Sequence, residues 1–264
     1  MKTVLTIAGS DSSAGAGIQA DLRTFNDHGI HGVCAITAVT CQNTTGVNTI
    51  HQVPANIVAS QIETVVTDIS VSAAKTGMLS NRSVVEVVAQ QITDLHIPSV
   101  VIDPVVVSSS GQRLLDTEAI EPLRTELLPK ATCITPNRME AELLSKRQVQ
   151  SLSDARDAAR SIVDLGVRAV VITGGHFYSE NAIDIFCDGH DVIEFARPRL
   201  TQPSAHGTGC IFSAAITAAL AQGQPLPDAV NMAKSYVFEI MQRSITIGAG
   251  EKILTKRDKA NGSG

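Results

Sequence analysis

The segment with the clearest chemical character is Gly207-Thr208-Gly209-Cys210, which stands directly before the apolar run Ile211 to Leu220. Glycines permit a tight turn with accessible backbone N–H groups, and a helix that starts here adds the positive end of its dipole. The segment therefore suits a phosphate oxyanion, while an ordinary glycine loop before a helix is the alternative. Cys210, in the first helical turn, is expected to have a lowered pKa, so that it accepts a proton from an attacking hydroxyl or helps to hold the anion. A small buried residue is the other interpretation of Cys210.

Two carboxylates follow other apolar segments. Asp103 ends the run Val100 to Ile102 and precedes a proline, and a carboxylate placed there needs a partner such as Mg²⁺ or a nearby lysine. A turn-starting aspartate is the alternative. Asn137 with Glu140 three residues later has the pattern of a helix capping box. Glu140 is compatible with a second task, holding a water on Mg²⁺, or with capping alone.

Polar residues near the N-terminus suggest a pocket for a small ligand. The glycine-rich loop 9–17 follows a first strand, but its spacing is not that of a dinucleotide fingerprint and no ribose-binding acid follows at the expected distance. This excludes a Rossmann dehydrogenase and favours a loop that closes over a ligand. Asp21 is able to accept a hydrogen bond from that ligand, with a solvated side chain as the alternative. The amide of Gln42 matches the ring nitrogen and exocyclic amine of an aminopyrimidine, unless Gln42 is only a turn residue.

These residues need a scaffold, and the sequence predicts one in which strands and helices alternate. Strands are expected at Val4 to Ala8, Val33 to Val39, Val100 to Asp103, Thr132 to Ile134 and Ala169 to Thr173; helices are expected near 16–28, 54–68, 81–95, 117–128, 137–144, 153–165, 208–222 and 226–243. Continuous apolar strands separated by helices indicate a parallel sheet covered on both faces. Asp188-Gly189 between two further apolar runs predicts an antiparallel hairpin at one edge.

Composition narrows the class of protein. The chain has 264 residues, 44% of them hydrophobic, and a formal net charge of -5 without a basic cluster, so nucleic acid is not an expected partner. The apolar runs are too short for a membrane span, and no signal peptide is expected. Five cysteines without a Cys-x-x-Cys pair suit reduced thiols and a cytoplasmic location. We expect a single domain over 1–254 and a disordered tail over 255–264.

Several motifs in order along the chain carry a family resemblance. They are Thr6 to Ser12, Gln19 to Leu22, Gln42-Asn43-Thr44, Lys75 to Leu79, Asp103-Pro104-Val105, Thr135-Pro136-Asn137 with Glu140, Gly174-Gly175-His176, and His206 to Cys210. Together they resemble the hydroxymethylpyrimidine/phosphomethylpyrimidine kinases of the ribokinase-like superfamily. The resemblance implies a three-layer α/β/α fold with a mainly parallel central sheet.

The family resemblance also implies an activity and a set of site residues. The expected reactions are two ATP-dependent, Mg²⁺-requiring phosphorylations, of 4-amino-5-hydroxymethyl-2-methylpyrimidine and then of its monophosphate, in thiamine biosynthesis by a homodimer. By resemblance, Cys210 is the base and the amides of Gly207, Thr208, Gly209 and Cys210 form the anion hole. The substrate pocket is formed by Gln42, Asp21, Gly9 and Met78; Asp103, Asn137 and Glu140 organise Mg²⁺ and the triphosphate; Thr173, Gly175 and Lys234 are further candidates on the nucleotide side.

The chain departs from the family at a few positions, and two other functions compete. Members commonly carry Lys or Thr at Ser109, an acid at Gln112 and Lys at Thr173, and the sequence after Gly250 also differs. Some pyridoxal kinases share the whole framework including the cysteine, but those that favour pyridoxal tend to carry an apolar residue at the position of Gln42. A ligand sensor without catalysis is the second alternative, and it would be free to lose the base and the carboxylates that this chain retains.

Overall fold

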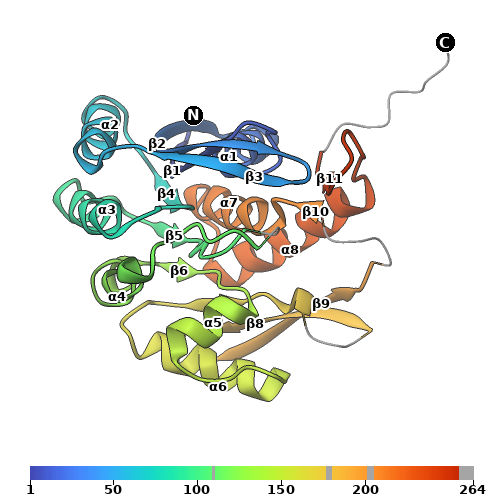
Figure 1. The fold of residues 1–264 in the computed structure, drawn as a ribbon. Coiled ribbons are helices and arrows are strands. Elements are labelled where there is room, and N and C mark those ends of the chain that lie inside the picture. The colour runs from blue at the N-terminus through green and yellow to red at the C-terminus, as the bar shows by residue number, and fades with distance from the viewer. Residues whose placement is uncertain (109–110, 177–179, 201–204, 256–264) are drawn as a thin grey trace, which may run out of the picture.

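The computed structural model describes residues 1–108, 111–176, 180–200 and 205–255, and in these ranges nine strands form one large sheet (Figure 1). The strand order is β3-β2-β1-β4-β5-β6-β7-β8-β9. The strands are β1 (Thr3–Asp11), β2 (His31–Asn43), β3 (Gly46–Gln52), β4 (Ala73–Thr76), β5 (Val100–Ile102), β6 (Cys133–Ile134), β7 (Val170–Ile172), β8 (Asn181–Cys187) and β9 (Val192–Pro198). Ser109 and the tail residues 256–264 lie outside the described residues.

The centre of the sheet is parallel and its two edges are antiparallel. Strands β2, β1, β4, β5, β6 and β7 pair in parallel, whereas β8 and β9 form the predicted antiparallel hairpin. Gly189 has the positive φ of 89° that the Asp-Gly turn requires. At the other edge, β2 and β3 form a second antiparallel hairpin, which the sequence did not reveal. The α/β fold with a mainly parallel sheet is therefore confirmed.

Helices cover both faces of the sheet, as predicted, and each face has its own apolar core. One face carries α1 (Gly17–Asp27), α7 (Thr208–Ala221) and α8 (Leu226–Gln242), and the other carries α2 (Ala55–Asp68), α3 (Arg82–Asp94), α5 (Arg138–Ser145) and α6 (Leu152–Val163). Helix α7 is buried continuously from Ile211 to Ala219, since it packs between the sheet, α1 and α8. A helix that is apolar all round belongs in such a position.

Two local predictions differ from the structure. The segment 117–128 is not one helix: 3₁₀, α and π turns follow one another as η1 (Thr117–Ala119), α4 (Ile120–Pro122), η2 (Leu123–Leu127) and η3 (Leu128–Lys130). Pro122 and Pro129 lack the N–H that a regular helix needs. Strand β4 was not predicted, because it is short and contains Lys75. A small parallel pair, β10 (Ala205–His206) with β11 (Lys252–Ile253), was also missed.

This topology brings distant residues together at the carboxyl ends of the parallel strands. Strand β1 is followed there by the loop at 12–16, β4 by Gly77 and Met78, β5 by Asp103, and β6 by a segment that contains Asn137. Helix α7 begins beside the same loop, since a Cβ added to Gly207 would lie 2.0 Å from the carbonyl oxygen of Gly15. The fold thus positions most of the residues singled out in the sequence around the N-terminus of α7.

Candidate active site at the start of helix α7

The glycine segment forms the turn that starts α7. Gly207 has a φ of 83°, and an added Cβ would overlap the backbone of Gly15, so only glycine fits there. The hydroxyl of Thr208 donates to the carbonyl oxygen of Ala205 at 2.7 Å and secures the turn. The N–H groups of the first helical turn have no acceptor within a helix, which makes this turn a potential anion site.

Cys210 differs from its prediction. Burial raises the pKa of Cys210 to about 12, while the Lys75 ammonium and the N–H of Gly17 act to lower it and the carboxylates of Asp103 and Asp21 raise it further. The expectation of a lowered pKa is therefore wrong, because the thiolate would be poorly solvated and two carboxylates add negative charge near it. A Cβ added to Gly209 would lie 3.8 Å from Asp103 Oδ2, so the Asp103 carboxylate lies against the first turn of α7, where its charge affects the pKa of Cys210.

Asp103 and Glu140 are both buried carboxyls at this edge of the sheet. Burial raises the pKa of Asp103 to about 6, although Lys75 lowers it, and Ser213 Oγ lies 3.3 Å from Asp103 Oδ2. Burial and the charge of Asp103 raise the pKa of Glu140 to about 7. The turn-starting interpretation of Asp103 does not account for this environment.

The predicted capping box is confirmed. Asn137 Oδ1 accepts from the N–H of Glu140 at 3.0 Å, and Glu140 Oε2 accepts from the N–H of Asn137 at 2.9 Å. The other oxygen of Glu140 accepts from the N–H of Val106 at 3.1 Å. Glu140 thus connects the start of α5 to the segment after Asp103.

The carboxyls of Asp103 and Glu140 fit a divalent cation whose remaining ligands are waters or substrate oxygens. Burial disfavours their charged forms, and a cation between them would relieve that penalty. Within the described ranges, no group of three His, Cys, Asp or Glu side chains is arranged to hold a metal ion. Mg²⁺ commonly keeps waters and takes oxygens from substrate phosphates, so two carboxyls are sufficient.

Beneath Cys210 lies an ion pair that the sequence analysis missed. Lys75 and Asp21 are fully buried, and Lys75 Nζ lies 2.9 and 3.0 Å from the two carboxylate oxygens of Asp21. Thr6 Oγ1 donates to the same carboxylate at 2.7 Å. The solvated alternative for Asp21 is therefore wrong. The sequence signal was Lys75 itself, a single charge within the apolar segment 73–79.

The N-terminal loop is held together by a second buried carboxylate, that of Asp11. It accepts from the N–H groups of Ser13, Gly15 and Ala16 at 2.8 to 3.0 Å. Burial acts to raise the pKa of Asp11, but hydrogen bonds from His206, Ser13 and Ala16 outweigh it and lower the pKa to about 2. Asp11 therefore stays ionised and fixes the loop. Asp11 was not among the residues predicted from the sequence.

Gln42 lines a cavity of about 260 Å³ close to this loop. Its lining residues are Gln42, Asn43, Thr44, Thr45, Gly46, Ser108, His206, Gly250 and Glu251. Gly9 and Met78, two other predicted pocket residues, contact each other: a Cβ on Gly9 would lie 3.2 Å from Met78 Sδ. Met78 is buried, and its carbonyl oxygen accepts from Thr37 at 2.5 Å.

The further nucleotide-side candidates lie toward β7 and β8. Lys234 is buried in an ion pair with Asp184 at 2.8 Å, and the same Asp184 oxygen accepts from the N–H of Gly174 at 2.8 Å. The Thr173 N–H donates to Pro136, and the Gly175 carbonyl oxygen accepts from Arg199. Because its charge is paired with Asp184, Lys234 stabilises this turn and is not positioned as a free phosphate ligand.

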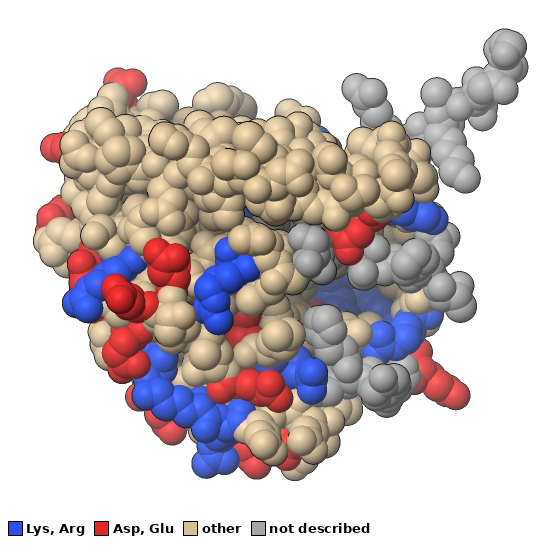
Figure 2. Space-filling view, in the orientation of Figure 1, with Lys and Arg blue, Asp and Glu red and all other residues tan. Residues whose placement is uncertain are grey.

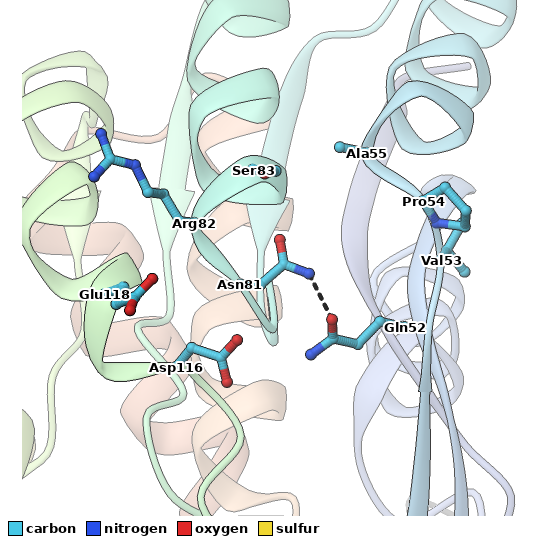
Figure 3. Close-up of a pocket in the computed structure, with 9 residues that line it drawn as sticks. All are labelled: Gln52, Val53, Pro54, Ala55, Asn81, Arg82, Ser83, Asp116 and Glu118. Carbon is cyan, nitrogen blue, oxygen red and sulfur yellow. Dashed lines mark hydrogen bonds between the residues drawn. The ribbon is translucent and has the colours of Figure 1, made fainter.

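A larger cavity, of about 400 Å³, lies apart from the predicted site residues (Figure 3). It is lined by Gln52, Val53, Pro54, Ala55, Asn81, Arg82, Ser83, Asp116 and Glu118. Asn81 Nδ2 donates to Gln52 Oε1 across it at 2.7 Å. Size alone does not make this cavity the active site, because it contains none of the predicted catalytic groups.

The sheet, its two helical layers and the glycine turn at α7 define a ribokinase-like kinase. The structure is similar to that of pyridoxal kinase from Bacillus subtilis, solved as an ADP complex, with a TM-score of 0.90 and 37% identity over 97% of both chains. The phosphomethylpyrimidine kinase family model matches residues 11–255, and the chain belongs to this family.

Curated relatives agree with that assignment. The chain is 47% identical to the hydroxymethylpyrimidine/phosphomethylpyrimidine kinase of Synechococcus elongatus over 94% of both proteins. It is 42% identical to the thiamine biosynthesis bifunctional protein of Geobacter sulfurreducens over 94% of this chain and 51% of that protein.

Among the helices that the structure describes, none has the length and hydropathy of a membrane span.

Proposed function

We propose that this protein uses ATP to phosphorylate 4-amino-5-hydroxymethyl-2-methylpyrimidine and then its monophosphate, on the route to thiamine. The observation that carries the proposal is the placement of the Asp103 carboxylate against the glycine turn that starts α7 and contains Cys210, in a chain of this family. Residues 1–254 would act as one kinase unit. An adenine nucleotide fits the fold, since the Bacillus subtilis relative was solved with ADP.

Cys210 and Asp103 would act together on the substrate proton. A thiol with a pKa of about 12 is protonated at neutral pH, whereas Asp103, with a pKa of about 6, is mostly ionised. As the substrate hydroxyl oxygen forms its bond to the γ-phosphorus, its proton would pass to Cys210 Sγ and the thiol proton to Asp103. The bond between the γ-phosphorus and the bridging oxygen breaks, and ADP leaves with that electron pair.

The other predicted site residues would stabilise the negative charge of the phosphate groups. The amides of Gly207, Thr208, Gly209 and Cys210 would stabilise the transferred phosphoryl group, where one well-placed donor is worth a factor of about 100 to 1,000. Asp103, Asn137 and Glu140 would hold Mg²⁺ through water together with the triphosphate, and the cation, when bound, neutralises phosphate charge.

Pyridoxal is the rival substrate, because the similarity to pyridoxal kinase extends over the whole chain. Gln42 favours the pyrimidine. Its amide lines the 260 Å³ cavity and offers both a donor and an acceptor, which an aminopyrimidine edge uses and a pyridine ring does not.

We also propose a homodimer formed through the β2–β3 edge. Residues 28–62 contain no Asp, Glu, Lys or Arg, and Figure 2 shows the surface over α2 and the β2–β3 hairpin almost without charge. Val39 and Ile57 are exposed on this segment, and β3 is a sheet edge. Ile57→Glu should convert a dimer to a monomer in sedimentation.

The five unpaired cysteines suit the cytoplasm.

A coupled ADP-release assay with Mg²⁺-ATP tests the function. It compares hydroxymethylpyrimidine, its monophosphate and pyridoxal. Cys210→Ala should lower kcat for hydroxymethylpyrimidine, whose hydroxyl must lose a proton, by about 100- to 10,000-fold, whereas Cys34→Ala, a partly buried cysteine near the start of β2, should not. Turnover of pyridoxal alone would assign the protein to vitamin B6 phosphorylation instead, and absence of any turnover would support a sensor.

A further inference from the structure

His206 is the residue that connects the N-terminal loop to Gln42. It is buried, it directly precedes Gly207, and its ring is packed against the loop: a Cβ on Gly15 would lie 2.3 Å from His206 Cδ2. His206 Nε2 lies 3.0 Å from Asp11 Oδ2 and 2.8 Å from the side-chain nitrogen of Gln42. On its other side, Nδ1 lies 3.6 Å from Glu251 Oε2.

Asp11 determines where a proton sits on this ring. Its carboxylate accepts three backbone N–H groups and the Ser13 hydroxyl, and an ionised carboxylate only accepts. His206 can form its hydrogen bond to Asp11 only as the donor, so Nε2 must carry a hydrogen. The same nitrogen then has no lone pair left for the amide of Gln42.

The amide of Gln42 must be oriented accordingly. Its oxygen and nitrogen are almost alike in size, so hydrogen bonds decide which way it points. An amide nitrogen facing His206 Nε2–H would place two donors 2.8 Å apart. On the far side, Thr40 Oγ1 lies 3.1 Å from the amide and 3.0 Å from the carbonyl oxygen of Ser10. With its single hydrogen donated to Ser10, Thr40 accepts, so both neighbours favour amide oxygen toward His206 and amide nitrogen toward Thr40.

We propose that His206, held by Asp11, is a specificity-determining residue that fixes the orientation of the Gln42 amide. The inference rests on the proposed role of Gln42 in substrate binding. With the orientation fixed, the amide oxygen accepts from an exocyclic amine and the remaining amide N–H donates to the adjacent ring nitrogen. A ring that presents these groups in reversed order, with a carbonyl oxygen beside a ring N–H, meets two mismatched contacts.

The 4-oxo analogue of hydroxymethylpyrimidine is the matching probe, because it carries that reversed order. The wild-type protein should prefer the amine by about 100-fold or more in kcat/KM, as expected where buried polar groups are left unpaired. His206→Asn, whose amide reaches only the position of Nδ1, should reduce the preference at least about 10-fold. His206→Gln, which places an N–H near the position of Nε2, should restore it to within about threefold. The exposed His96→Asn serves as the control variant.

Gln42→Met separates this inference from the role of Gln42. If Gln42→Met abolishes the preference and His206→Asn keeps it, Gln42 reads the ring without the help of His206, and the inference is wrong. If Gln42→Met keeps the preference, the role of Gln42 fails and the inference fails with it. Nitrogen chemical shifts of ¹⁵N-histidine-labelled wild-type protein provide a readout that needs no stable variant at His206. A His206 Nε2 without a hydrogen would overturn the inference.

Discussion

The buried ion pair of Lys75 and Asp21 allows a quantitative prediction. Lys75→Met keeps most of the side-chain volume but leaves the Asp21 carboxylate without its cation in a fully buried position. Of the hydrogen bonds to that carboxylate, the one from Thr6 remains. Breaking one side of a buried pair costs about 3 to 5 kcal/mol. Against a total stability of about 5 to 15 kcal/mol, this is a large loss.

Urea unfolding measures that loss. With a slope of about 3 kcal/mol per molar, the transition midpoint should fall by about 1 to 1.7 M. Asp21→Asn alone should also destabilise, because it leaves the Lys75 ammonium unpaired. The double variant leaves neither charge alone. Its loss of unfolding free energy should therefore be smaller than the sum of the two single losses, by at least about 2 kcal/mol. A loss below about 1 kcal/mol for Lys75→Met, or additive effects in the double variant, would refute the reasoning.

Three further predictions follow from single contacts. Asp11, with its pKa lowered to about 2, contributes stability that is complete above the usual value of 3.8 and is lost as the pH falls toward 2; in urea unfolding, Asp11→Asn should lose about 1 to 2 kcal/mol at pH 7 and show less acid sensitivity than the wild type. Gly207→Ala should reduce kcat at least about 10-fold because its Cβ overlaps the loop and φ is 83°, whereas Gly223→Ala, with a φ of 87° and no neighbour within 4 Å, should cost only about 1 to 2 kcal/mol of stability and leave kcat unaltered. Lys234→Met leaves Asp184 unpaired, so it should destabilise by about 3 kcal/mol and raise KM for ATP through the turn at Gly174; a loss below about 1 kcal/mol would contradict this.

Much of the fold was readable from local pattern. The apolar strands around the sheet centre are buried on both faces, so they appear in the sequence as continuous hydrophobic runs. The capping box of Asn137 and Glu140 and the Asp-Gly hairpin turn depend on residues close together in the chain. Strand β3 and the broken helix at 117–130 were missed because their residues have mixed propensities and neighbouring elements decide their conformation.

The sequence by itself determined that polar residues follow the apolar strands and that a glycine turn precedes an apolar helix, because residue type and local spacing specify these features. Only the tertiary structure decided their electrostatics. The pKa of Cys210 is high because the folded chain buries the thiol and brings Asp103 and Asp21 near it, which no first-turn rule reveals. The pair of Lys75 and Asp21 and the contact of His206 with Asp11 join residues that are 54 and 195 positions apart. Burial and long-range contacts set these energies, and both arise only when the sheet and its helices are assembled.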